Sequence, residues 1–397
     1  MNFTWFSQVA AVTGVSLREL PTRWVSSAVA VFGIAGVVMV MVGILSMAAG
    51  FRAALSETSD PRVAMVLRAS STSELDSGFS REDTLVIAES ELIARGENGS
   101  LISSELYVVV DVARKSTGTS SNVPLRGVKP VAMDVRGNVR IAEGRMFSPG
   151  LNEIVVGSGA RNLFAGLDVG STVTWGTNTW TVVGIIEAGG GVPESEIWAD
   201  LHSLQSAYRR GSSVQTVRAR LASEDDFQSF KDSLTGDPRL NVSVIRERDF
   251  YADQSRLING LITGVGYFVA VLMGLGAIFG AVNTMYTAVA SRMREIATWR
   301  ALGFKSSAVF ISVMTEALTL GLIGGLVGAL IAYVVFNGFQ VATMNWTSFS
   351  QLTFAFAVTP GLIKSGVLYA LLMGLIGGLL PGLRAARLPI TVALREL

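Results

Sequence analysis

The sequence predicts an α-helical membrane protein with four transmembrane helices and an extracytoplasmic mixed α/β domain inserted between the first and second helices. Three observations support this fold class. Half of the 397 residues are hydrophobic, and they gather in long uncharged runs. Between the first two runs lies a stretch of mixed polar and apolar residues that is typical of an ordinary folded domain. Arginine and lysine residues mark the connections that stay on the cytoplasmic side.

The uncharged runs supply the four helices. They cover residues 24–51, 257–291, 317–363 and 365–383. A helix that rises about 1.5 Å per residue needs roughly 20 residues to cross the hydrocarbon layer, so each run can hold one crossing. The second part of the third run is polar and interrupted by Asn, Ser and Pro, so we expect a loop there. A soluble protein with buried core helices is the alternative, but four such runs exceed what a soluble core needs.

The first run could be mistaken for a secretory signal peptide. Arg18 and Arg23 precede it, and the small residues of "SMAAG" at 46–50 resemble a cleavage site. Its apolar stretch is far longer than the roughly 7–15 residues of a signal-peptide core, so we expect a retained transmembrane helix. The segment 16–24 is compatible with a short amphipathic helix on the membrane surface.

The distribution of positive charge predicts which connections face the cytoplasm. The N-terminal segment, the connection 292–305 and the C-terminal tail all carry Arg or Lys, whereas the connection between the third and fourth helices has none before Lys364. Because Lys and Arg concentrate in short cytoplasmic loops, both termini and the 292–305 connection are predicted to be cytoplasmic. The segment 52–256 then lies outside, since long domains translocate largely regardless of their charge.

The segment 52–256 has the local patterns of a mixed α/β domain. A hairpin is expected where apolar and polar residues alternate on both sides of 176–178. No helix breaker separates the end of the segment from the second uncharged run, so the second helix is expected to extend outward as a stalk. The other expected elements are strands at 105–115, 152–159 and 241–247, the hairpin strands within 171–189, and helices at 80–94 and 225–234.

These patterns give expected boundaries for the whole chain. They are a cytoplasmic N-terminal segment at 1–22, the first transmembrane helix at 23–51, the outer α/β domain with its stalk at 52–256, the second helix at 257–287, a cytoplasmic helical connection at 288–306, the third helix at 307–336, an outer loop at 337–363, the fourth helix at 364–383 and a cytoplasmic tail at 384–397.

Composition and motifs exclude several classes of function. A net charge of +1 provides no field that would attract nucleic acid. The chain has no Cys and one His, His202, so a metal site built from His and Cys is excluded and no catalytic or metal-binding residue is assigned. It also has no G-x-x-x-x-G-K-[ST] motif, whose backbone and lysine cradle nucleotide phosphates. We therefore expect no enzyme activity and no cofactor bound by this chain.

Glycines recur at helical spacing within the predicted spans. Two small residues four apart let helix backbones approach closely. We expect these glycines to pack helices within the four-helix unit or within a dimer, with a substrate path as the alternative. They are Gly276, Gly280, Gly321, Gly324, Gly325, Gly328, Gly374 and Gly378.

Residues 291–304, "SRMREIATWRALGF", carry several charged side chains, whereas the segments before and after them are hydrophobic enough to cross a membrane. On a helix, one face would carry Met293, Ile296, Ala297, Arg300 and Phe304, and another Arg292, Glu295, Trp299 and Leu302. Because neither face is cleanly polar or apolar, we expect a helix that contacts the membrane underside on one face and a protein partner on the other. Gly303 is its expected stop. A generic positive-inside anchor is the alternative.

Glu316 is the acidic residue that precedes the third uncharged run, near the cytoplasmic side of the third helix. An ionisable residue at membrane depth is a functional candidate by default. We expect it to pair with an arginine or to cap the cytoplasmic loops. Proton coupling is the alternative.

Residues 294–335 resemble the C-terminal permease domain of the MacB/FtsX/LolC-type ABC transporter subunits. The matching residues are Arg294, Glu295, Ile296, Arg300, Ala301, Leu302, Gly303, Glu316, Gly324 and Gly325. The tail is similar to the family's closing pattern at Pro381, Arg384 to Arg387 and Ala393 to Arg395. The stretch 143–191, which begins "EGRMFSPGLNEIVVGSG", is similar to the MacB-type periplasmic core domain.

The resemblance implies a permease whose 288–306 connection is the coupling helix, seated in a groove of a separate ABC ATPase subunit. The coupling residues would be Arg292, Arg294, Glu295, Ile296, Thr298, Trp299, Arg300, Ala301, Leu302 and Gly303. ATP and Mg²⁺ would bind to that partner. A second copy or a homologous permease would complete the assembly in a bacterial inner membrane, and a periplasmic adaptor with an outer-membrane duct is a further implied partner.

Two functions follow from the resemblance. The first is an ABC permease that uses ATP hydrolysis in the partner to change the periplasmic domain and so drive efflux or extraction of a substrate. The second is FtsX-like signalling that controls a cell-wall hydrolase or another envelope protein. A membrane-anchored enzyme is disfavoured, because the outer segment has no G-x-S-x-G motif and only one His.

Overall fold

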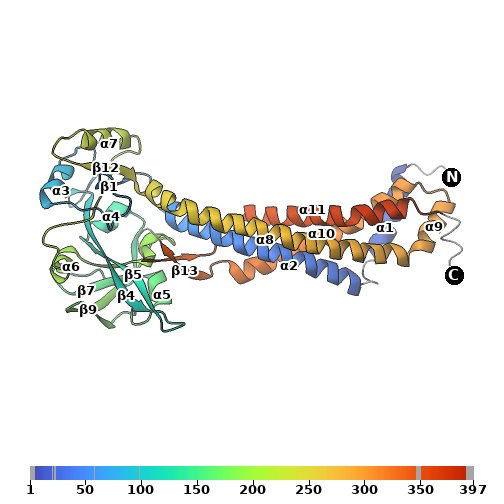
Figure 1. Cartoon of the computed structure of the whole chain (residues 1–397), viewed down its shortest axis with the longest axis horizontal. Coiled ribbons are helices and arrows are strands. Elements are labelled where there is room, and N and C mark those ends of the chain that lie inside the picture. Colours follow the sequence, from blue (N-terminus) through green and yellow to red (C-terminus); the bar gives the residue numbers. More distant parts are fainter. Residues whose placement is uncertain are drawn as a thin grey trace. The chain divides into compact units, whose positions relative to one another are not determined.

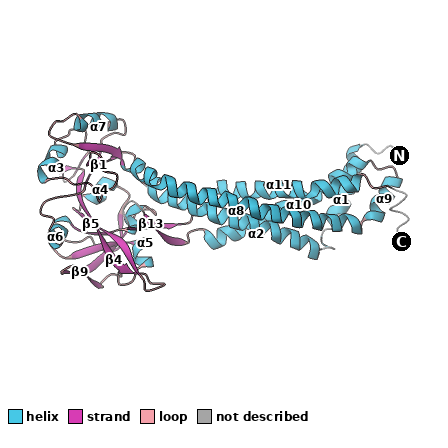
Figure 2. Cartoon of the chain, in the orientation of Figure 1, coloured by secondary structure: helices cyan, strands magenta, loops and turns pink. Residues whose placement is uncertain are grey.

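The computed structural model describes residues 5–19, 21, 24–57, 59–97, 99–345 and 350–389. Its contacts divide the chain into two compact units, whose elements are labelled in Figure 1. The membrane unit comprises Met1–Ala49, Gly260–Asn337 and Ala357–Leu397, and the outer unit comprises Gly50–Asn259 and Gly338–Phe356. Figure 2 shows that the described strands belong to the outer unit, whereas the membrane unit is built of helices.

Four helices in the described part of the chain are long and apolar enough to cross a membrane, as predicted. The candidate spans are Trp24–Leu55, Ile258–Ser291, Ser306–Phe336 and Pro360–Ala386. The helices of the membrane unit are α1 (Trp5–Glu19), α2 (Trp24–Arg52), α8 (Glu247–Ser291), α9 (Met293–Ala301), α10 (Ser306–Phe336) and α11 (Pro360–Ala386). Helix α8 already begins at Glu247, within the outer unit, so the expected outward extension of the second helix is present.

Glycines bring α10 and α11 into close contact. A Cβ atom added to Gly321 would lie 2.8 Å from the carbonyl oxygen of Ala370, and one added to Gly374 would lie 2.7 Å from that of Ala317. The same two alanines also face Gly325 and Gly378. These positions therefore hold glycine because the two backbones approach too closely for a side chain.

A second pair of glycines packs α10 against α2. A Cβ atom added to Gly324 would lie 2.9 Å from the Cβ atom of Ile34, and one added to Gly328 would collide with the backbone of Ala35. Ile34 belongs to an apolar cluster with α10 and α11 residues, including Ala329. The overlapping glycine patterns of α10 thus allow this helix to pack closely against both α2 and α11.

The two glycines of α8 that were predicted to pack helices, Gly276 and Gly280, do not pack in this way. Gly276 and Gly280 are both exposed, and no atom lies within 4 Å of a Cβ atom added at either position. The expected packing within the four-helix unit is therefore absent at these two positions, because this face of α8 points away from the other helices. A contact with a second chain stays a prediction for them.

The outer unit is built on one mixed ten-stranded sheet with the strand order β12-β1-β11-β4-β5-β10-β7-β9-β6, and β8 pairs with β9 at its side. Pairs β5–β10 and β7–β9 are parallel, and the other pairs are antiparallel. The core contains Trp180 of β9 and Phe164, both fully buried. This architecture confirms the predicted mixed α/β domain between the first and second spans.

The bounds of the outer-unit elements are as follows. The strands are β1 (Val63–Arg68), β2 (Arg95–Gly96), β3 (Gly99–Ser100), β4 (Ile102–Ala113), β5 (Ser120–Val128), β6 (Arg140–Gly144), β7 (Glu153–Gly157), β8 (Thr172–Trp175), β9 (Asn178–Glu187), β10 (Ile197–Asp200), β11 (Thr216–Arg220), β12 (Val242–Arg246), β13 (Gln340–Asn345) and β14 (Ser350–Ala355). The helices are η2 (Ala53–Glu57), α3 (Arg81–Ala88), α4 (Ala132–Arg136), α5 (Ser158–Leu163), η3 (Val192–Ser195), α6 (Leu201–Ala207) and α7 (Phe227–Thr235).

The local sequence signals in this unit correspond to real elements. The expected hairpin within 171–189 is β8–β9, with Trp175 paired to Asn178 across the turn. The expected helix at 80–94 is α3, which starts at a Ser80 cap and closes a capping box with Asp83. It ends at Ala88, earlier than expected.

The connection 337–363 is not the outer loop that the sequence suggested. It contains the hairpin β13–β14, whose register pairs Gln340 with Ala355, and this hairpin belongs to the outer unit. Two polar residues of the hairpin, Ser350 and Thr353, are buried and hydrogen-bonded. The Oγ atom of Ser350 lies 2.9 Å from the Oη atom of Tyr107, and the backbone N–H of Thr353 donates to the Oγ atom of Ser195 at 2.8 Å.

Candidate functional site

The predicted coupling segment forms its own short helix between α8 and α10. Helix α9 starts directly after Arg292, where the backbone leaves the α8 geometry. Gly303 then adopts a φ of 95°, in the left-handed region that glycine enters without strain, and α10 begins at Ser306. The stop predicted at Gly303 is confirmed.

One face of α9 packs into the membrane unit. Ile296 and Ala297 are buried, and Ile296 joins an apolar cluster with Val309 of α10. The Nη1 atom of Arg300 donates a 2.7 Å hydrogen bond to the carbonyl oxygen of Ala386, at the end of α11. This inward face matches one of the two helical faces expected from the sequence.

The opposite face of α9 is open. Its exposed residues are Arg294, Glu295, Thr298, Ala301, Leu302 and Gly303. Leu302 is 72% exposed. This face, which we call the outward face of α9, combines both signs of charge with an apolar side chain, the mixture found at protein interfaces.

Arg292 takes a different position from the other predicted coupling residues. It is 4% exposed, and its Nη2 atom donates a 3.0 Å hydrogen bond to the Oε1 atom of Glu316 in α10. Its Nε atom lies 3.4 Å from the Oε2 atom of Glu19, at the end of α1. The expected pairing of Glu316 with an arginine is therefore present. Arg292 has little surface left to offer a partner, so it anchors α9 within the chain.

Helix α1 covers this anchor. Its buried residues Gln8, Val12 and Ser16 are spaced four apart and so share one face. The Oγ atoms of Ser16 and Ser312 lie 2.7 Å apart, and the Oε1 atom of Gln8 accepts a 3.2 Å hydrogen bond from the backbone N–H of Lys305. Helix α1 thus packs on α10 and includes residues 16–19 of the segment 16–24, for which an amphipathic helix on the membrane surface stays a prediction.

A second cluster of charge lies inside the outer unit, and sequence reasoning did not find it. We call it the ion cluster; its members are Glu74, Glu105, Arg126, Arg136, Glu196, Arg218 and Glu247. Each of them is at most 5% exposed. They come from strands β4, β5 and β11, from α4, from the loop after β1, from the residue between η3 and β10, and from the first residue of α8.

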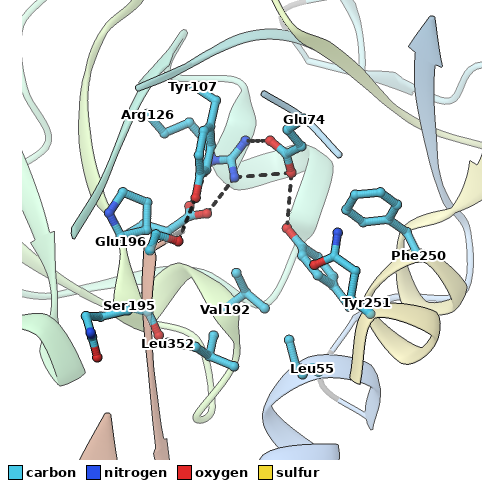
Figure 3. Close-up of a pocket in the computed structure, with 14 residues that line it drawn as sticks. Leu55, Glu74, Tyr107, Arg126, Val192, Ser195, Glu196, Phe250, Tyr251 and Leu352 are labelled. Carbon is cyan, nitrogen blue, oxygen red and sulfur yellow. Dashed lines mark hydrogen bonds and ion pairs between the residues drawn. The ribbon is translucent and has the colours of Figure 1, made fainter. Parts of the chain in front are cut away.

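Arg126 is the centre of one half of the ion cluster (Figure 3). It binds Glu196 through two hydrogen bonds, Nε to Oε2 at 3.0 Å and Nη2 to Oε1 at 2.6 Å. Its Nη1 atom lies 2.5 Å from Glu74 and 3.0 Å from Glu105. The guanidinium carbon also lies 4.9 Å from the ring centre of Tyr107, within the range of a cation–π contact.

Arg218 is the centre of the other half. Its Nε, Nη1 and Nη2 atoms donate to Glu247 at 2.6 Å, Glu105 at 2.5 Å and Glu74 at 2.7 Å. Arg136 adds two hydrogen bonds to Glu105, at 2.8 and 2.9 Å. Because every charge is met by charge-assisted hydrogen bonds, the burial of so many ionised groups is tolerable.

The pKa values in the ion cluster follow from burial and from the neighbouring charges. Burial alone would raise the pKa of Glu105, but the guanidinium groups of Arg136 and Arg218 hold it well below its usual range. Burial also opposes ionisation of Glu74, and its arginine neighbours again lower the pKa. Burial raises the pKa of Tyr107 to about 12. These carboxylates therefore stay ionised at neutral pH.

The family of the chain follows from comparisons with known proteins. A family model described as the MacB-like periplasmic core domain matches residues 27–236, and one described as the FtsX-like permease C-terminal matches residues 267–390. The chain belongs to the MacB/FtsX family of ABC transporter permeases. The two matches together cover α2, most of the outer unit, the coupling segment and the helices that follow it.

Curated relatives of this permease chain span most of its length. The Macrolide export ATP-binding/permease protein MacB of Hahella chejuensis (strain KCTC 2396) is 27% identical over 79% of this chain and 49% of its own length. MacB 1/2 of Paracoccus denitrificans (strain Pd 1222) is 25% identical over 80% of this chain and 48% of its own length. The permease chain thus spans about half the length of the curated relatives it matches.

Among solved structures, the periplasmic region of MacB from Actinobacillus actinomycetemcomitans is 13% identical, with a TM-score of 0.37, and covers 50% of this chain and 94% of that one. The extracellular domain of the noncanonic ABC-type transporter YknZ from Gram-positive bacteria is 17% identical, with a TM-score of 0.34, and covers 46% of this chain and all of that one.

The structure sorts the predicted site residues of the permease into different environments. The outward face of α9 holds most of the predicted coupling residues, while Arg292 and Ile296 are buried and Trp299 and Arg300 are half-buried. The family pattern at 393–395 lies outside the described residues.

The ion cluster could have been suspected from charged residues set inside apolar strand patterns, such as Arg126 in "VPLRGV" and Glu105 in "SSELYVVV".

Proposed function

We propose that this chain is the permease subunit of an ABC transporter that couples ATP hydrolysis in a separate ATPase subunit to a conformational change of the outer unit. That change would drive efflux or extraction of a substrate across the envelope. The single observation that carries the proposal is the construction of α9. Its inward face is anchored by Arg292, Ile296 and Arg300, while its outward face is left open for a partner.

The family and the sequence support the rest of the arrangement. ABC permeases work with ATPases, and the names of the MacB relatives describe export by ATP-binding/permease proteins. This sequence has no P-loop motif, so ATP and Mg²⁺ would bind to the partner. By the distribution of Arg and Lys, α9 and both termini would be cytoplasmic in a bacterial inner membrane. A second permease copy or a homologue, and a periplasmic adaptor with an outer-membrane duct, would complete the assembly.

A pull-down of the tagged full chain in mild detergent, followed by mass spectrometry, tests this function. We expect an ABC ATPase in the eluate. The charge reversal R294E on the outward face should reduce its recovery, whereas R18E, an equal charge change at an exposed position of α1, should not. Equal recovery with wild type and R294E would contradict α9 as the docking element, and the absence of any ATPase would contradict the function.

Signalling is the second candidate, because the FtsX-like match covers residues 267–390. The same pull-down separates the two. An ATPase together with a periplasmic adaptor supports export or extraction, and an ATPase together with a cell-wall hydrolase or its activator supports signalling.

A further inference from the structure

The first turns of α8 are fastened to the centre of the outer sheet by the ion cluster. The carboxylate of Glu247, the first residue of α8, accepts a 2.6 Å hydrogen bond from the Nε atom of Arg218 in β11. One turn later, the Oη atom of Tyr251 accepts a 3.0 Å hydrogen bond from the Nη2 atom of Arg218 and lies 3.5 Å from Glu74. Glu247 and Tyr251 are 5% and 6% exposed, so both contacts are made away from water.

The other chain segments that connect to membrane helices meet at the same place. A cavity of about 30 Å³, room for one or two water molecules, lies beside Arg126 and Glu74 (Figure 3). Leu55, which follows α2, lines it, as do Tyr251 of α8 and Leu352 of β14. The hairpin β13–β14, which links α10 to α11, is further held by the Tyr107–Ser350 hydrogen bond of 2.9 Å. Each membrane connection that enters the outer unit therefore contacts the ion cluster or its rim.

The ion cluster contains more carboxylates than guanidinium groups, and this excess of negative charge indicates the role of Glu247. Three guanidinium groups face four carboxylates, all buried. Three carboxylates would suffice to neutralise the three arginines, and the fourth carboxylate, Glu247, is contributed by α8. A surplus buried carboxylate costs desolvation energy. Its presence is understandable if its role is to hold α8 to Arg218 rather than to stabilise the sheet.

We propose that the ion cluster is the mechanical joint through which α8 moves the outer sheet. Glu247 and Tyr251 are its positioning residues, because both form hydrogen bonds with Arg218. The proposal deepens the permease function and rests on it. Movement that enters α8 at its membrane end would reach β11 through Arg218, and β4 through Glu105, without a flexible linker in between. The small cavity beside the joint leaves space for its side chains to shift.

Hydrogen–deuterium exchange on the full chain in detergent tests whether the ion cluster holds the first turns of α8 in place. The variant E247A removes the tether and leaves three charges of each sign in the cluster, so the sheet should remain folded. The matched control is D249A, which also removes an acidic residue from the first turn of α8 but is exposed. The first four amides of a helix lack intrahelical partners, so the readout is a peptide that begins at residue 251.

We expect exchange in that peptide to rise about tenfold to a hundredfold in E247A, as lost charge-assisted hydrogen bonds predict, and to stay at the wild-type rate in D249A. Peptides from β4 and β5 should keep their protection. If E247A matched D249A, or if β4 and β5 lost protection together with α8, the cluster would be a general core element and the proposal would be overturned. Should E247A fail to fold, Y251F removes one contact of the same grip and is judged by the same criteria.

The complex purified with its ATPase tests transmission. With wild type, ATP plus vanadate should change the exchange of β4 peptides relative to nucleotide-free complex, and E247A should lose most of that change while retaining the bound ATPase. Full transmission in E247A would overturn the joint. A wild-type complex without any nucleotide response would contradict the proposed function instead, while the exchange results on the isolated chain would still decide whether the grip exists.

Discussion

The pair between Arg292 and Glu316 should be the most sensitive polar contact of the membrane unit. Two opposite charges 3.0 Å apart attract with about 5.5 kcal/mol at an effective dielectric constant of about 20. Both residues are 4% exposed, so much of that attraction is offset by desolvation. Removing one partner of a buried pair typically costs about 3–5 kcal/mol, because the other charge stays buried. Since Arg292 keeps Glu19 at 3.4 Å, E316L should lie at the low end, about 3 kcal/mol.

A double-mutant cycle measures this contact. The full chain in detergent is unfolded by denaturant titration as wild type, R292M, E316L and the double variant, with the exposed E295A as the control. E295A should change the free energy of unfolding by no more than about 0.5 kcal/mol. The double variant should recover most of the loss, because two apolar residues can replace a buried ion pair at little cost. A coupling energy below about 0.5 kcal/mol would refute the reasoning.

Three further predictions concern packing, pH and the hairpin. G321V should destabilise the membrane unit by about 1–3 kcal/mol because no space exists beside α11. In the same denaturant titration, G276A, on the open face of α8, should not destabilise it, because the added methyl group meets no atom and alanine favours a helix over glycine by about 0.5–1 kcal/mol. The lowered pKa values of Glu74 and Glu105 stabilise the outer unit fully above their unfolded value of about 4.3, and this stability should fall as the pH drops below it, so a Tm unchanged between pH 6 and pH 3 would contradict the assignment. S195A should cost about 1–3 kcal/mol, because the buried backbone N–H of β14 loses its acceptor, and faster hydrogen exchange confined to that strand would show it.

The membrane-spanning part of this fold was the most predictable, because its cause is local. An uncharged run of sufficient length has no stable alternative to a helix in lipid, so the four spans followed from the positions of the charged residues that bound the runs, such as Arg52, Arg256 and Lys364. The stop of α9 at Gly303 was equally local, since a left-handed residue after a helix favours glycine.

The features that the sequence did not predict depend on contacts between residues that are far apart in the chain. The hairpin β13–β14 looked like a loop because the stretch is polar and interrupted by Asn, Ser and Pro. Tyr107 and Ser195, more than a hundred residues earlier in the chain, contact its buried residues Ser350 and Thr353. The ion cluster has the same origin. Arg218 and Glu74 are separated by 144 residues, so only the completed sheet brings them together.

Buried ion pairs hold both ends of α8 in place. Its first residue, Glu247, is held by Arg218 within the outer unit, and the residue directly after its last turn, Arg292, is held by Glu316 within the membrane unit. Charged hydrogen bonds are directional, so they fix a helix end more tightly than apolar contacts, which tolerate sliding. A helix gripped in this way at both ends can transmit a displacement of α9 without losing it to local slippage. If so, E247A and E316A should weaken transmission to a similar extent, although their positions are separated by the full length of α8.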